Sequence, residues 1–158
     1  MLEIREDDLS GGPVRELLTL HLSGMHANSP PGHVFALDLS GLQSPHVTVW
    51  TAWDRDEIAG VGALKVLDSV TGEVKSMRTH PSHLRKGVGA ALLERIIEAA
   101  RAKGLKWLSL ETGSGPAFDA ALSLYRKRGF TEGEAFGEYE PSHFSQFLHM
   151  PLCLGEAA

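Results

Sequence analysis

Thiols and long apolar runs are the two features that the sequence has least of. Its 158 residues include one cysteine, Cys153, so an internal disulfide framework and a multi-cysteine zinc site are both excluded. No segment approaches the ~20 consecutive apolar residues that a membrane-spanning helix needs. The opening residues, MLEIREDDLSGG, lack the basic and apolar segments of a secretory signal. We therefore expect a cytoplasmic protein without a membrane partner.

Positive charge is also scarce, but it is concentrated in one segment. The formal net charge is −5, which argues against nucleic acid as a partner because phosphate binding needs an extended basic face. Between Glu73 and Glu94 the sequence has no acidic residue. The cations of this segment are Lys75, Arg78, Arg85 and Lys86. A solvated basic surface and a binding site for an anion are both consistent with such a cluster.

Chain length and hydrophobic periodicity predict a single domain of mixed α and β structure over residues 1–158. Three segments with strand-like patterns, joined by the turns DRDE and DSVTG, predict an antiparallel meander. Helices are expected to begin near Pro13, Val88 and Pro116, whereas the segment 34–42 fits either a short helix or a strand. The expected strands are 2–6, 47–53, 57–67, 72–80 and 105–112, with two more between 130 and 152.

The segment LRKGVG at residues 84–89 precedes one of these helices and has the properties of an anion site. The first turn of a helix leaves backbone N–H groups unpaired and carries partial positive charge. Gly87 and Gly89 leave room for a pyrophosphate to approach the backbone. Arg85 and Lys86 can add charge-assisted contacts. Alternatively, the glycines of this turn serve only to let neighbouring elements pack closely against it.

Two common phosphate-binding motifs are absent. The dinucleotide fingerprint lacks its third glycine here, and the Walker pattern does not occur, so a different phosphate-bearing cofactor is indicated. The segments GEVKSMRTHP, LRKGVGAAL, LKWLSLETG and LYRKRGF follow one another instead. Over about residues 57–131 they resemble the GNAT superfamily of acyl-CoA-dependent N-acetyltransferases, in its small bacterial form. The resemblance implies an α/β fold with a mixed, mostly antiparallel sheet of about six to seven strands and helices on both faces.

The resemblance also implies acetyl-CoA as the acetyl donor. The family pattern [QR]-x-x-G-x-[GA] maps onto residues 84–89, with Leu84 where Arg or Gln is usual. It implies backbone contacts to the diphosphate from 85 to 90 and a pantetheine arm along the strand at 77–79, whose residues are otherwise ordinary members of a sheet. The implied coenzyme A contacts are Met77, Arg78, Thr79, Arg85, Lys86, Gly87, Val88, Gly89, Ala90, Ser114 and Phe118.

Direct acetyl transfer needs a neutral amine, and freeing an alkylamine of pKa ~10.4 of its proton at neutral pH costs roughly 4.6 kcal/mol. That cost favours a general base. Glu111 is the first candidate because it ends an apolar strand where a cleft would open; a carboxylate that caps the following Gly-Ser-Gly turn is the alternative. Glu73 is the second candidate. No motif around Cys153 indicates a covalent acyl-enzyme, so we expect a ternary complex.

The departing thiolate benefits from a proton, and Tyr125 is the predicted donor. It matches the tyrosine of the family's Y-x-x-x-G-F segment. Tyr125 also continues an apolar helical stripe with Phe118 and Leu122. The two interpretations are compatible, because a phenol can bury its ring and keep its hydroxyl at the edge of a cleft.

The acceptor pocket is expected between residues 25–36 and 136–145. The acceptor itself is either a small-molecule amine or a peptide amine. The candidate acceptor residues are His26, His33, Glu73 and Tyr139. The spacing of His80 and His83 is typical of metal ligands, but the sequence offers no third ligand nearby, so we expect no metal. Homodimers are common in the family, and the sequence locates no interface.

Two other functions remain open. A non-catalytic acyl-CoA-binding sensor of the same fold would account for Leu84. A nucleotide-binding domain would account for the glycine turn alone.

Overall fold

A seven-stranded sheet, in the order β1-β2-β3-β4-β5-β7-β6, runs through residues 2–152, which a computed structural model describes. Neighbouring strands pair antiparallel except β4 and β5, which pair parallel. The strands are β1 (Leu2–Asp7), β2 (Val47–Asp54), β3 (Glu57–Val66), β4 (Thr71–Thr79), β5 (Trp107–Thr112), β6 (Thr131–Glu132) and β7 (Gln146–Pro151). The mixed, mostly antiparallel sheet and the meander predicted from the sequence are confirmed.

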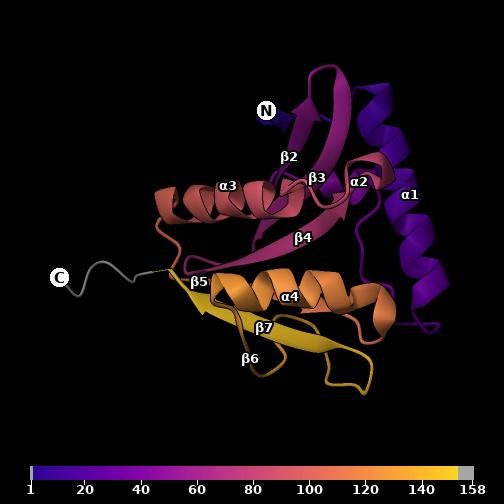
Figure 1. Ribbon diagram of the computed structural model, residues 1–158. Helices are drawn as coiled ribbons and strands as arrows, with labels where there is room; N and C mark the ends of the chain where they lie inside the picture. The colour runs from indigo at the N-terminus through magenta and orange to yellow at the C-terminus, as the bar shows by residue number, and fades with distance from the viewer. Residues whose placement is uncertain (1, 153–158) are drawn as a thin grey trace.

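Helices cover both faces of this sheet, and α3 and α4 lie roughly parallel to each other in Figure 1. Successive residues of a strand point to opposite faces, so Val49 packs in one apolar cluster with α1 and α2, and Trp50 packs in the other with α3 and α4. The helices are α1 (Gly12–Asn28), α2 (Leu39–Leu42), α3 (Val88–Ala102) and α4 (Asp119–Arg128), with 3₁₀ turns η1 (Pro81–His83) and η2 (Pro116–Phe118).

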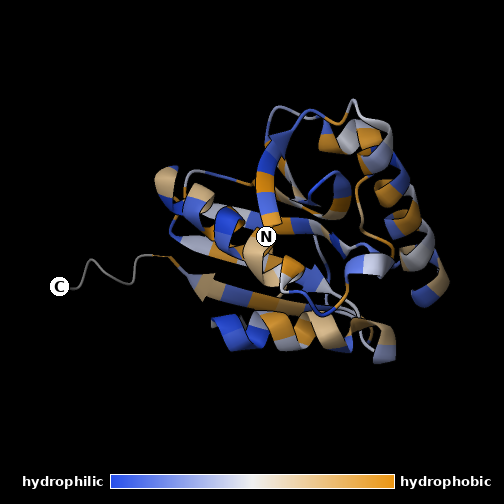
Figure 2. Cartoon of the chain, turned by 45° about the horizontal axis from the view of Figure 1, so that its top comes forward, coloured by the Kyte–Doolittle hydropathy of each residue, from blue (hydrophilic) through white to orange (hydrophobic). Residues whose placement is uncertain are grey.

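The segment that fitted either a helix or a strand contains the single helical turn α2. The Asp38 carboxylate begins it by accepting a hydrogen bond from the Gly41 amide at 2.9 Å. Along α1 and α4, hydrophobic and hydrophilic residues are interleaved, as expected of helices with one face on a sheet (Figure 2). None of the helices within residues 2–152 has the length and apolar content to cross a bilayer. Cys153 lies outside the described residues.

Two irregularities of β4 open the sheet near its centre. Val61 pairs with Arg78 but Ala63 pairs with Lys75, so β4 carries a bulge centred on Ser76, which has a φ of 57°. Within the described sheet, β4 pairs with β5 over Thr71–Glu73 alone. The second half of β4 therefore separates from β5 and leaves its backbone groups unpaired on that side.

Candidate active site

A cavity of about 420 Å³ fills the space where β4 and β5 separate. Its walls come from these two strands, from α1, from the start of α3, and from α4. The cavity therefore joins the strand that was expected to bind pantetheine to both candidate catalytic residues. Of the residues predicted from sequence, those that line it are Met77, Arg78, Thr79, Gly89, Glu111, Phe118 and Tyr125.

The glycine turn before α3 offers backbone amides at the edge of this cavity. Gly87 is the N-cap of α3, with a φ of 79° that favours glycine, and no side chain caps the helix there. The first-turn amides therefore keep their capacity to bind an anion. Gly89 has a packing role, because a Cβ atom there would lie 3.1 Å from Leu124 of α4. Leu84 is exposed and lines the cavity at the position where the family pattern has Arg or Gln.

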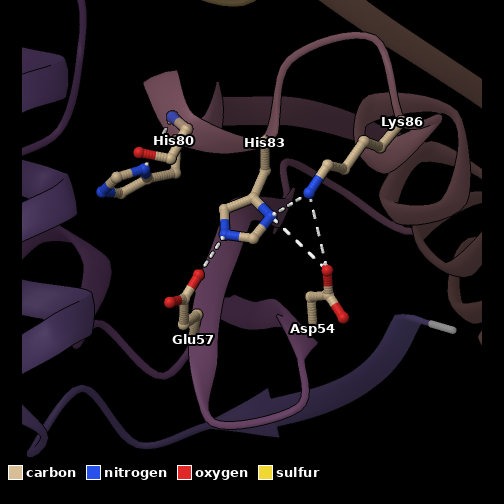
Figure 3. Close-up of polar contacts among 6 residues, drawn as sticks. Asp54, Glu57, His80, His83 and Lys86 are labelled. Atoms are coloured by element: carbon tan, nitrogen blue, oxygen red, sulfur yellow. Dashed lines mark hydrogen bonds and ion pairs between the residues drawn. The ribbon is translucent and has the colours of Figure 1, made fainter.

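The side chain of Lys86 is held by the β2–β3 turn rather than standing free (Figure 3). Its ammonium lies 3.2 Å from His83 Nδ1 and 3.6 Å from the Asp54 carboxylate. His83 is buried, and its Nε2 lies 3.0 Å from Glu57. A phosphate contact from Lys86 would have to compete with this cluster, whereas Arg85 is exposed. Sequence reasoning missed Asp54 and Glu57, because nothing local to the glycine turn indicates which hairpin packs beneath it.

Glu111 is half-buried on the wall of the cavity, and burial raises its pKa to about 7. A hydrogen bond from Ser145 and the charge of Lys75 act in the opposite direction, and the neighbouring charge of Glu73 acts in the same direction. Within residues 2–152, the side-chain hydrogen bonds of the Gly-Ser-Gly turn go to Phe144 and to the first residue of β7, and not to the Glu111 carboxylate. A carboxyl group with a pKa near 7 is suited to accept a proton at neutral pH.

Glu73 belongs to a buried network rather than to the cavity wall. It accepts a hydrogen bond from the Tyr139 hydroxyl and lies 3.2 Å from the Lys75 ammonium. Lys75 also donates to the Tyr139 hydroxyl at 2.8 Å. Burial and the Glu73 carboxylate together raise the pKa of Tyr139. Lys75 was missed as a site residue, although its spacing of two from Glu73 on a strand places both on one face.

Tyr125 lies on α4 with its ring in the core and its side chain on the cavity wall. The ring packs against Phe130 at a centroid distance of 5.7 Å. Burial raises the pKa of the phenol well above its usual value, so it carries its proton at neutral pH. Tyr125 therefore both packs in the apolar stripe of α4 and lines the cavity, as the sequence predicted.

Three other predicted residues, Ser114, His33 and His26, are not part of the cavity wall. The Ser114 hydroxyl donates to the Phe144 carbonyl at 2.7 Å, so it neither caps a helix nor stands free. His33 packs between Phe35 and Phe144, and its buried Nδ1 has no hydrogen-bond partner in the described structure. His26 borders a separate hollow around residues 29–32.

The site thus combines a sheet that splits at its parallel strand pair with a glycine turn and the start of a helix beside the split. The model of the acetyltransferase (GNAT) family matches residues 14–130. The chain belongs to this family, as the sequence resemblance predicted.

Known proteins similar to the chain carry acetyltransferase descriptions. It is 48% identical over 151 residues to the uncharacterized N-acetyltransferase YsnE of Bacillus subtilis, covering 96% of this chain and 100% of the relative. A putative acyl-CoA N-acyltransferase from Klebsiella pneumoniae has a similar structure, with a TM-score of 0.82, 27% identity, and 96% and 98% coverage of the two chains. A GNAT acetyltransferase from Elizabethkingia anophelis, solved with acetyl-CoA bound, has a TM-score of 0.70, 22% identity, and 96% and 98% coverage.

Proposed function

We propose that the protein transfers an acetyl group from acetyl-CoA to a primary amine of a small molecule or peptide, by direct attack in a ternary complex. The observation that carries this proposal is that Glu111 and Tyr125 line one cavity at the split between β4 and β5. The residues fit the donor: the unpaired edge of β4 suits an extended amide-containing arm, and the uncapped start of α3 suits a diphosphate. The structure of the Elizabethkingia relative with acetyl-CoA supports this choice of donor.

Acetyl-CoA supplies an activated acetyl thioester, and the chain's own residues handle the protons. Glu111 accepts a proton from the amine, which frees the nitrogen lone pair to form the C–N bond with the acetyl carbon. As the C–S bond breaks, the new amide nitrogen loses its second proton to solvent and Tyr125 donates its phenolic proton to the departing sulfur. Solvent then removes the proton from Glu111 and returns one to Tyr125. The products are an N-acetylated amine and coenzyme A with a free thiol.

A thiol-release assay across a panel of amines tests the proposal. We expect Glu111→Gln to lower kcat by about 10²–10⁴-fold and Tyr125→Phe to lower it substantially, with little change in acetyl-CoA affinity in either variant. Glu98→Gln is the matched control, because Glu98 is an exposed carboxylate on α3. Wild-type rates in both site variants would remove the two roles. Tight acetyl-CoA binding without thiol release from any amine would favour the acyl-CoA sensor instead.

A further inference from the structure

Arg78 brings a positive charge to the part of the cavity wall that lies against α1. Its side chain leaves β4 toward α1, where Nε donates to His21 Nδ1 at 3.1 Å and Nη2 donates to the His21 carbonyl at 3.3 Å. Gly24 on the same helix makes room for it, because a Cβ atom there would lie 2.5 Å from Nη2. The guanidinium is therefore seated in a fitted recess of α1 and is part of the cavity wall.

This charge has no anionic partner in the part of the chain that the structure describes. Among residues 2–152, no carboxylate lies within ion-pair distance of Arg78. Burial, and then the charge of Arg78, lower the pKa of His21 to about 4, so the imidazole is neutral and only accepts the hydrogen bond. A guanidinium has five N–H donors, and the two bonds to His21 use two of them.

Neither of the two nearby carboxylates pairs with Arg78. Glu73 is paired with Lys75 and Tyr139. Glu111 makes no ion pair with Arg78 within residues 2–152, and the charge of Lys75 lowers its pKa. A half-buried cation without a counter-charge is costly, and an anionic group on a ligand would offset that cost through charge-assisted bonds. Burial lowers the pKa of Arg78, which shows that its surroundings disfavour an unpaired charge.

The wall beside Arg78 is apolar and aromatic. Met25, Phe35 and Ala36 line the same cavity. The Phe35 ring packs edge-on against Tyr139 at a centroid distance of 5.2 Å, which fixes its position. An acceptor bound here would place an apolar group on this wall, an anionic group at Arg78 and its amine toward Glu111.

We propose that the acceptor is a small amino carboxylate with an apolar or aromatic side group, such as a free apolar amino acid, and that Arg78 binds its carboxylate. This inference rests on the proposed acetyl transfer and specifies its substrate class. The bond to be made is still the amide at the amine; the carboxylate of the acceptor is unchanged by the reaction.

Matched acceptors test the inference without any substitution. Thiol release is measured with phenylalanine, phenylalaninamide and phenethylamine, and then with leucine and leucinamide. The carboxylate holds the proton on the neighbouring amine more firmly, so chemistry alone favours the amides. We expect kcat/KM for each acid to exceed that for its amide by about tenfold or more, as a hydrogen-bonded ion pair would give. Equal or higher values for the amides would overturn the inference and leave the acetyl transfer standing.

Variants assign the preference to Arg78. We expect Arg78→Gln to reduce the acid-to-amide ratio to near one and Arg78→Lys to retain part of it. Arg55→Gln, at an exposed arginine in the β2–β3 turn, removes the same charge and should retain the wild-type ratio. An unchanged ratio in Arg78→Gln, with a raised KM for acetyl-CoA, would assign Arg78 to the donor and contradict the inference.

A binding measurement separates this inference from the proposed function. Thermal shifts are recorded with N-acetylphenylalanine and N-acetylphenylalaninamide in the presence of coenzyme A. A larger shift with the acid, lost in Arg78→Gln, would support the carboxylate site even if no amine released thiol. Equal shifts for the two compounds would count against the site, whatever the outcome of the activity assay.

Discussion

Burial acts on Glu111 and Tyr125 in the same direction and suits them to the opposite tasks that we propose for them. It raises the pKa of Glu111 to about 7, into the range where a carboxylate can accept and release a proton. It raises the pKa of Tyr125 still further above neutrality, so the phenol remains a proton donor. Two groups with separated pKa values in one cavity are the arrangement that acid and base catalysis requires.

The pKa of Glu111 predicts the pH dependence of activity. Because the ionised carboxylate is the proposed base, kcat/KM should rise with increasing pH through a limb centred near pH 7. The ionisation of the amine adds a second limb at higher pH. A rate profile of the wild type and of Glu111→Gln over about pH 5.5–9 checks this, and the limb near pH 7 should be missing from the variant. Persistence of that limb would assign it to another group.

Lys75 links the buried network to Glu111, the proposed general base. Lys75→Met would leave the Glu73 carboxylate buried without its cation, and breaking a buried pair in this way costs about 3–5 kcal/mol. The double variant Glu73→Gln/Lys75→Met should recover much of that loss. Urea unfolding measures both. Because Lys75 also lowers the pKa of Glu111, the activity limb of Lys75→Met should move to higher pH; a limb that stays in place would contradict this coupling.

At the scale of elements, the site depends on where β4 stops pairing. The bulge at Ser76 turns the strand, and the loss of pairing after Glu73 separates it from β5. Periodicity predicted β4 and β5 as strands, but a serine with positive φ gives no signal in the sequence. The split is therefore a property of two strands and the helices that they carry, and local sequence cannot reveal it.

The 3₁₀ turn η1 connects the bulged strand to the glycine turn, and His83 anchors it to the β2–β3 hairpin. His83→Ala should loosen residues 84–89 and raise the KM for acetyl-CoA several-fold, with a smaller change in kcat, because Glu111 and Tyr125 lie on other elements. His46→Ala, at an exposed histidine before β2, is the control. Steady-state kinetics with acetyl-CoA as the varied substrate measures this effect. An unchanged KM would show that the glycine turn holds its shape without the anchor.

At the scale of the whole molecule, the sequence predicted what is local or periodic and missed what joins distant segments. The meander, the helix starts near Pro13 and Val88, and the glycine turn follow from spacing and turn residues, and the structure confirms them. The contact between Lys75 and Tyr139 joins residues 64 positions apart. No pattern within one element encodes such a pair, because it depends on how the loop before β7 folds over the sheet.

The proposed donor site spans α3, β4 and the cavity, so its occupation should stabilise the whole domain. A ligand present at 100 times its Kd adds about 2.7 kcal/mol to the free energy of unfolding. For a domain of this size we therefore expect acetyl-CoA to raise the Tm by roughly 5–11 °C, with Kd taken from titration calorimetry. ATP and NAD at equal concentrations are the controls, because they carry phosphates but no pantetheine arm for the unpaired edge of β4. A shift with ATP or NAD and none with acetyl-CoA would point to a nucleotide-binding domain and remove the donor assignment on which the acetyl transfer depends.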